Sequence, residues 1–290
     1  MQQPVQSGFL SWLKGVRRTP LWFIALVMVV AFGMGAFTNL VVFPTGALQW
    51  VHVSTNGWID GTFLGYVPQI IVVGFLFWKV GKLRWNDFGL TWSRLWWGLG
   101  WTAFAWCIIQ VTPFIFSSSE IVVRPEWSTH ASWMLCDFVE GQLMSNALVE
   151  EVIFRAFLIT QFAILFHRVL NWNWTVAVFA AVLVSAFIFS IWHIPNRINL
   201  GHYETAADVW SDQWFLFKAA VFFALIFILT NNLFIVVGIH ALDNSSPDIF
   251  TGTNFTVTEI LLLAIFITMG VWRWWVRAHW HEHKKQQAPL

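Results

Sequence analysis

The chain of 290 residues consists mostly of long apolar stretches separated by short polar segments. Runs of about 20 apolar residues are typical of helices that cross a membrane. We therefore expect an all-α fold, a polytopic bundle of about eight transmembrane helices in a single integral membrane domain over residues 1–290. The predicted spans are residues 20–43, 62–81, 95–116, 133–166, 173–195, 214–232, 233–246 and 256–276.

Three features of this pattern are irregular. The fourth run is longer than one perpendicular crossing needs, so we expect it to be tilted or to begin with a surface turn at residues 134–140. The seventh run is short, and only the two asparagines at 231–232 separate it from the sixth, which leaves seven spans as the alternative. The polar stretch 196–213 is expected to form an external loop.

Composition agrees with a membrane protein. Hydrophobic residues make up 58% of the chain and charged residues only 11%, whereas soluble domains carry about 25% charged residues. The 22 Trp and 29 Phe suit intramembrane interfaces and headgroup-level belts. The net charge of +1 gives no indication of nucleic-acid binding. Cys107 and Cys136 have no metal or disulfide spacing and are interpreted as small apolar residues.

The basic residues predict the orientation, because cytoplasmic loops carry the excess of Lys and Arg. With the N-terminus inside and eight crossings, three basic residues fall outside: Arg124, Arg197 and Lys218. The basic residues on the cytoplasmic side are Lys14, Arg17, Arg18, Lys79, Lys82, Arg84, Arg94, Arg168, Arg273, Arg277, Lys284 and Lys285. We therefore expect both termini in the cytoplasm. As a separate expectation, the membrane is a prokaryotic plasma (inner) membrane.

Several ionisable or polar side chains interrupt the apolar runs. A charged group at bilayer depth costs at least a few kcal/mol, so such groups are paired, hydrated or functional. They occur in three separate runs, which makes a shared site the natural hypothesis. These residues are Glu150, Glu151, Arg155, His193, His240 and Asn244.

The first run carries two carboxylates with different surroundings. Glu151 and Arg155 are four residues apart and share a helix face, whereas Glu150 is rotated from Glu151 by about 100°. Pairing with Arg155 keeps Glu151 ionised, and Glu150 is left free to act as a general base towards water. The alternative is that all three form a purely structural ion network.

The other two runs supply imidazoles. His193 follows Phe189 by one turn, and Pro195 is expected to end its helix. Alone, His193 could equally be a hydrogen-bonded interfacial residue. His240 and Asn244 are four apart and point the same way, so they could hold a water, bind a metal or donate hydrogen bonds to an oxyanion. Helix-terminal packing is the alternative for this pair.

The ordered motifs resemble those of a known family. Glu-Glu-x-x-x-Arg at 150–155, Phe-x-x-x-His at 189–193 and His-x-x-x-Asn at 240–244 resemble the CPBP family of intramembrane proteases. That family is also called the Abi or CAAX amino-terminal protease family and includes the type II CAAX prenyl endopeptidases. The resemblance covers about residues 133–250, the motif-bearing core. One departure is Ala156, where many relatives have Gly.

The resemblance implies an intramembrane endopeptidase that hydrolyses a peptide bond near the membrane surface. By analogy, Glu150 and His193 activate the attacking water, while His240 and Asn244 stabilise the tetrahedral oxyanion. The supporting residues are Glu151, Arg155 and Phe189.

The cofactor and the substrate stay more open. Glu150, His193 and His240 could ligate zinc, but the chain has no His-Glu-x-x-His helix, so we expect a glutamate-activated water without a metal. The expected partners are membrane lipid and a peptide or lipidated protein substrate. His193 approaches the external face, whereas a prenylated cytosolic substrate needs a site open to the cytoplasm. Peptide maturation, bacteriocin self-immunity and envelope processing are therefore alternatives.

A competing hypothesis is a non-enzymatic membrane protein. A transporter or a bacteriocin-immunity protein could use the same polar cluster to bind an ion or a peptide. Transporters usually contain inverted repeats or paired broken helices, and no such internal symmetry is evident in the sequence.

Overall fold

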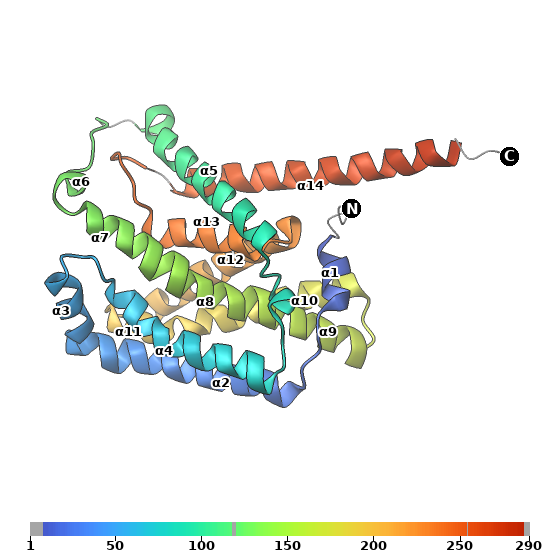
Figure 1. Ribbon diagram of the computed structural model, residues 1–290, viewed down its shortest axis with the longest axis horizontal. Coiled ribbons are helices and arrows are strands. Elements are labelled where there is room, and N and C mark those ends of the chain that lie inside the picture. The colour runs from blue at the N-terminus through green and yellow to red at the C-terminus, as the bar shows by residue number, and fades with distance from the viewer. Residues whose placement is uncertain (1–7, 118–119, 254, 287–290) are drawn as a thin grey trace.

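The protein is a bundle of helices arranged around one long central helix (Figure 1). The computed structural model describes residues 8–117, 120–253 and 255–286, with the backbone alone for 255 and 272–286. Within these ranges there is no β-strand, and the only bridge outside helices pairs Val123 with Phe250. The all-α prediction is therefore confirmed.

The first half of the chain contains five α-helices joined by short π-helical and 3₁₀ segments. The α-helices are α1 (Phe9–Gly15), α2 (Leu21–Phe37), α3 (Ala47–Ser54), α4 (Gly61–Phe75) and α5 (Trp92–Phe116). The connecting segments are η1 (Thr38–Val42), η2 (Phe43–Thr45), η3 (Leu76–Val80) and η4 (Trp85–Phe88).

The second half carries the motifs found in the sequence. Its first helices are α6 (Glu126–Thr129), α7 (Ala131–Cys136), η5 (Asp137–Asn146), α8 (Ala147–Glu151), η6 (Val152–Ile159) and α9 (Thr160–Val169). They are followed by α10 (Trp174–Trp192), α11 (Ile194–Asn199), α12 (Ala206–Thr230), α13 (Leu233–Ser245) and α14 (Phe255–Gln286).

Five helices among the described residues are long and apolar enough to cross a membrane, so the count of eight is not confirmed. These candidate spans are Leu21–Thr45, Gly61–Val80, Trp85–Phe116, Trp174–Asn199 and Ala206–Thr230. Two shorter apolar helices, Leu233–Ser245 and Thr256–Val271, match the last two predicted spans. The remaining predicted span, 133–166, is helical but carries the charged groups of the candidate site.

That span belongs to a central helix that continues from Ala131 to Val169 through α7, η5, α8, η6 and α9. The surface turn expected at residues 134–140 is absent; η5 has π-helical hydrogen bonding instead. Side-chain hydroxyls bond to carbonyls of these turns, since Ser145 Oγ donates to the Gly141 carbonyl at 2.6 Å and Thr160 Oγ1 to the Ala156 carbonyl at 2.6 Å. Wide turns of this kind are frequently found at functional sites.

A sharp turn divides α12 from α13 where the two asparagines were noted. Asn231 adopts a left-handed backbone with φ of 51°, a conformation that Asn tolerates better than most residues. Asn232 then caps α13, because its side-chain oxygen accepts a hydrogen bond from the Phe234 N–H at 3.1 Å. Two helices rather than one long helix are therefore formed, and α13 is directed back into the bundle.

The polar stretch 196–213 differs from the loop that was expected. Its beginning belongs to α11, and α12 already starts at Ala206. The reason is a capping box in which Thr205 accepts from the Asp208 N–H and Asp208 accepts from the Thr205 N–H. Pro195 also does not end α10 directly, because α10 stops at Trp192 and the proline lies in the first turn of α11, which begins at Ile194.

The helices α5 and α13 cross closely at two glycines. A Cβ added to Gly98 would lie 2.3 Å from the Phe234 Cβ and 2.9 Å from the Phe234 carbonyl carbon. On the other side, a Cβ at Gly238 would lie 1.7 Å from Thr102 Oγ1. Small residues permit such close backbone approach in membrane helices, and here they set the position of α13.

We expect Gly98→Ala to push α5 away from α13 and to lower the free energy of unfolding by about 1–3 kcal/mol, as overpacking does. The matched control is Gly100→Ala on the same helix, because a Cβ there meets nothing within 4 Å. Thermal unfolding of the detergent-purified variants measures the difference. Equal stability of the two variants would show that the close crossing is not needed.

Candidate active site

The three motif-bearing segments meet inside the bundle. Glu150 and Glu151 lie on α8, His193 lies at the junction of α10 and α11, and His240 lies in the middle of α13. The central helix packs against both α10 and α13. Glu150 is 2% exposed, Glu151 0% and His240 3%, so these groups depend on one another for electrostatic compensation.

A chain of ionisable groups runs from Arg155 through Glu151 to His240. Arg155 Nη1 lies 3.1 Å from Glu151 Oε1, and the same oxygen lies 2.7 Å from His240 Nδ1. The Arg155 guanidinium also sits 4.4 Å from the centroid of the Phe189 ring and 5.4 Å from that of Phe223. Glu151 therefore pairs with Arg155, as the helical period suggested, and also holds His240.

Glu150 lies between two imidazoles. Its Oε1 is 3.7 Å from His193 Nε2, and its Oε2 is 3.7 Å from His240 Nε2. Both distances exceed those of direct hydrogen bonds, and Oε2 has no hydrogen-bond partner within the described part of the chain. Glu150 is thus a buried carboxylate whose capacity to accept hydrogen bonds is not used up by its neighbours.

The hydrogen bonds of the two histidines fix which ring nitrogen faces Glu150. His193 Nδ1 lies 2.9 Å from the Phe189 carbonyl oxygen, which can only accept, so Nδ1 carries the proton there. His240 Nδ1 likewise faces the Glu151 carboxylate. Both rings therefore direct Nε2 towards Glu150.

Aromatic rings hold the imidazoles in place. Phe189 packs against His193 with ring centroids 4.5 Å apart, and Phe223 stacks on His240 at 4.6 Å with an interplanar angle of 22°. Phe189 thus contacts His193 through its ring and through its carbonyl, in addition to the Arg155 guanidinium. Phe189 was predicted to be a supporting residue, and these are the contacts that it makes with the other predicted site residues.

Asn244 is the one predicted site residue that the described contacts do not join to the others. It is exposed, and its Nδ2 donates a hydrogen bond to Gln142 Oε1 at 2.9 Å. It lies one turn beyond His240 on α13, towards the end of the helix. Its amide therefore lies closer than His240 to the C-terminal end of α13.

Two further polar residues were missed by sequence reasoning. Tyr66 on α4 is 8% exposed and interacts electrostatically with Glu150. Gln142 is also 8% exposed and accepts hydrogen bonds from both Asn244 and Asn146. A signal for Tyr66 was available, because it is one of only two tyrosines in a chain with 29 phenylalanines. Gln142 gave no such signal, because it lies in a mixed segment with Glu140, Ser145 and Asn146.

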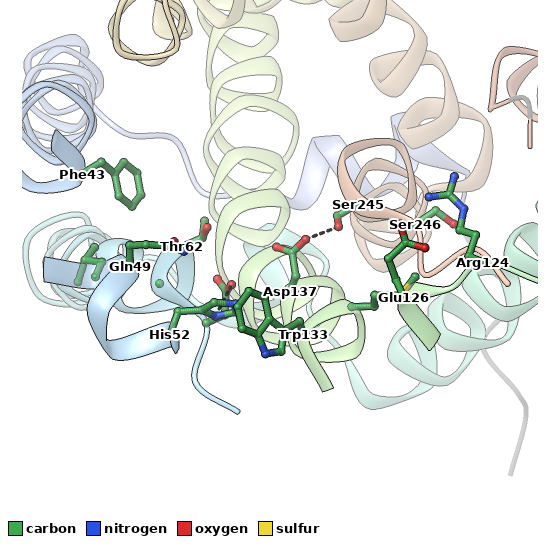
Figure 2. A pocket seen from close by; sticks show the side chains of 14 residues that line it. Phe43, Gln49, His52, Thr62, Arg124, Glu126, Trp133, Asp137, Ser245 and Ser246 are labelled. Atoms are coloured by element: carbon green, nitrogen blue, oxygen red, sulfur yellow. Dashed lines mark hydrogen bonds and ion pairs between the residues drawn. The ribbon is translucent and has the colours of Figure 1, made fainter. Parts of the chain in front are cut away.

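A cavity of about 680 Å³ opens at the end of the bundle where α7 begins and α13 ends. Figure 2 shows Asp137 of the central helix hydrogen-bonded to Ser245, the residue after Asn244. His52 and Asp60 also line this cavity. Burial, and to a lesser degree the neighbouring Asp137, raises the pKa of Asp60, while hydrogen bonds from the backbone, led by that of Phe63, oppose this.

The described residues contain no group of three or more His, Cys, Asp or Glu side chains arranged to hold a metal ion. The zinc candidates Glu150, His193 and His240 do lie next to one another, but the two Glu150–histidine separations are 3.7 Å each. The site fits a carboxylate flanked by two oriented imidazoles.

Comparison with protein families gives a match at the motif-bearing core. Residues 133–246 match the family model of the type II CAAX prenyl endopeptidase Rce1-like proteins. This range contains all the predicted site residues, from Glu150 to Asn244. No curated protein and no solved structure matches the chain. The chain therefore carries an Rce1-like domain of the CPBP family, and the resemblance noted in the sequence is confirmed.

Proposed function

We propose that the protein is an intramembrane endopeptidase in which Glu150 and His193 activate a water molecule for attack on a peptide bond. The observation that carries this proposal is the position of Glu150, a buried carboxylate with the Nε2 atoms of His193 and His240 each 3.7 Å from one of its oxygens. The Rce1-like domain supports a protease of this class.

The first step of the mechanism is removal of a proton from water. A water that lies beside the Glu150–His193 pair can donate one hydrogen to the carboxylate and one to the unprotonated Nε2 of His193. Glu150 takes the proton as the hydroxide attacks the carbonyl, and it returns the proton to the leaving amine. The carbon–nitrogen bond then breaks, and the products are a carboxylic acid and an amine.

His240 acts on the other reactant. Because its Nδ1–H is held by Glu151, its Nε2 donates a hydrogen bond only when the ring carries both protons. A protonated His240 together with Arg155 balances the charges of Glu150 and Glu151. The imidazolium can then stabilise the oxyanion that forms at the scissile carbonyl. Asn244, one turn away, would bind the substrate backbone on its approach.

The two ends of the bundle differ in charge, and this difference indicates from which side of the membrane the substrate reaches the site. Figure 1 shows α3, α6 and α11 at one end and α1 and α9 at the other. Acidic residues on the elements at the α3 end (Figure 1) are Asp60, Glu126, Asp137, Glu140, Glu204, Asp208, Asp212 and Asp248, and two of them pair with the arginines of that end, Arg124 and Arg197. Basic residues on the elements at the α1 end (Figure 1) are Lys14, Arg17, Arg18, Lys79, Lys82, Arg84, Arg94 and Arg168, beside one acidic residue, Asp87.

Since cytoplasmic ends carry the excess of positive charge, we assign the α1 end to the cytoplasm. His193 lies at the end of α10 towards the opposite, acidic side. The substrate of this protease is then a peptide segment at the non-cytoplasmic face, not a prenylated cytosolic protein. The proposed reaction is the peptide-bond hydrolysis that the Rce1-like domain supports, and the substrate reaches the site from the non-cytoplasmic side.

A peptide-cleavage assay tests the proposal. The detergent-purified chain is incubated with a quenched fluorescent peptide library, offered plain and with a prenylated cysteine. We expect cleavage by the wild type, no loss with a chelator, and no detectable cleavage by His193→Ala. The exposed His202→Ala is the matched control and keeps full activity. Absence of cleavage by the wild type, or full turnover by His193→Ala, would contradict the mechanism; a loss with chelator would assign a metal to it.

A further inference from the structure

An apolar groove of about 490 Å³ lies between α4 and the central helix, apart from the candidate active site. Gly74 and Phe77 form one wall, and Leu148 and Val152 form the floor. A Cβ at Gly74 would meet nothing within 4 Å, so the groove is open at this point. Its volume falls within the range of sites that bind small organic ligands.

The groove ends at a group of residues suited to the membrane surface. Arg84 lines its α1-side end, and Trp78 and Trp85 flank it with 69% and 76% of their surface exposed. Tryptophan collects at the headgroup level of membranes. Lys82 is exposed beside them. The groove therefore runs from an apolar interior to a cationic, tryptophan-flanked rim.

We propose that this groove binds an anionic phospholipid, with one acyl chain along Phe77 and Leu148 and the phosphate at Arg84. Charge complementarity selects this occupant, because a basic pocket between helices on the basic side of a membrane protein suits an anionic headgroup. The only acidic residue of this loop, Asp87, is already held: its carboxylate accepts hydrogen bonds from the Arg17 and Arg84 backbone N–H groups. The Arg84 guanidinium is therefore available to bind the phosphate of the lipid.

The lipid contacts the central helix through residues other than those of the candidate active site. Val149 and Ile153 also line the groove and flank Glu150 and Glu151 in the chain, whereas the Glu150 carboxylate faces histidines of α10 and α13. None of the groove's lining residues belongs to the proposed catalytic set. The bound lipid therefore braces the central helix against α4 and stabilises the fold without touching the reacting atoms.

Lipid addition to the delipidated, detergent-purified full chain tests this site. We expect phosphatidylglycerol at about 100 times its Kd to raise the Tm by about 5 °C, and phosphatidylcholine to raise it much less. Native mass spectrometry should show one retained phosphatidylglycerol. Arg84→Gln and the groove-filling Gly74→Leu should each remove the difference between the two lipids.

Matched controls separate this site from general effects of charge and volume. Arg18→Gln removes an exposed basic residue at the same end of the bundle, and Gly33→Leu enlarges a glycine of α2 that also has open space around it. Both should keep the phosphatidylglycerol effect. If Gly74→Leu does not fold, Ile71→Trp fills the same groove from a 64% exposed position.

Three results would overturn the proposal. The first is an equal Tm shift with both lipids, and the second is an undiminished phosphatidylglycerol effect in the groove-filling variant. The third is an equal shift with glycerol phosphate, which lacks acyl chains and would show that surface charge alone responds.

Discussion

Glu150→Gln is expected to reduce kcat by a factor of about 10²–10⁴, the usual contribution of a general base. The substitution keeps the shape of the side chain, and the new amide can donate a hydrogen bond towards His193 Nε2, so the fold should be retained. KM should change little, because the loss concerns an interaction of the transition state. Steady-state kinetics with the peptide found in the cleavage assay measure both constants.

Two controls make this result specific to the position of Glu150. Glu204→Gln removes an exposed carboxylate at the acidic end of the bundle and should leave kcat unchanged. Glu150→Asp keeps the charge but withdraws it from the two imidazoles, so partial activity is expected. Wild-type kcat in Glu150→Gln would remove Glu150 from the chemistry and leave it a structural role.

The long apolar runs made most of the fold predictable, because burial in a membrane imposes helices of a known length. The short α1 and α3 were not predicted, since they span only seven and eight residues and have no extended pattern. In α1, Phe9 is buried against Phe227 with ring centroids 5.5 Å apart. Such helices are fixed by tertiary contacts that a local pattern does not contain.

Some contacts of the candidate site could likewise be predicted from the sequence, and others could not. The contact of Glu151 with Arg155 follows from their spacing of four residues on one helix. The contact of Glu151 with His240 joins α8 to α13 and depends on how the two helices pack, so the sequence alone left His240 grouped with Asn244. The π-helical hydrogen bonding of η5 and η6, which flank α8, was equally hidden, because π turns have no distinct apolar period.

Glu151 contacts both Arg155 and His240, so we expect a change at Arg155 to affect both the stability of the fold and the proposed activity. The Glu151 carboxylate accepts the hydrogen bond that keeps the proton on His240 Nδ1, and Arg155 offsets the negative charge of that carboxylate. Arg155 in turn rests against Phe189, whose carbonyl orients His193. One buried cation therefore links the two imidazoles that face Glu150.

Arg155→Leu is accordingly expected to lower the free energy of unfolding by about 3–5 kcal/mol, because it removes one partner of a buried ion pair and leaves Glu151 underbalanced. Denaturant unfolding of the purified variant measures this loss. The matched control, Arg168→Leu, removes an exposed arginine near the end of the central helix and should change stability by less than about 0.5 kcal/mol.

A double-mutant cycle identifies the cause of the loss. If the cost comes from the unpaired carboxylate, Glu151→Gln combined with Arg155→Leu should be less destabilising than the sum of the single changes, by about 0.5–3 kcal/mol. Additive effects would instead assign the cost to the lost packing of Arg155 on Phe189 and Phe223. The variant Arg155→Lys separates these terms further, since it keeps the charge and gives up the planar contact with the rings.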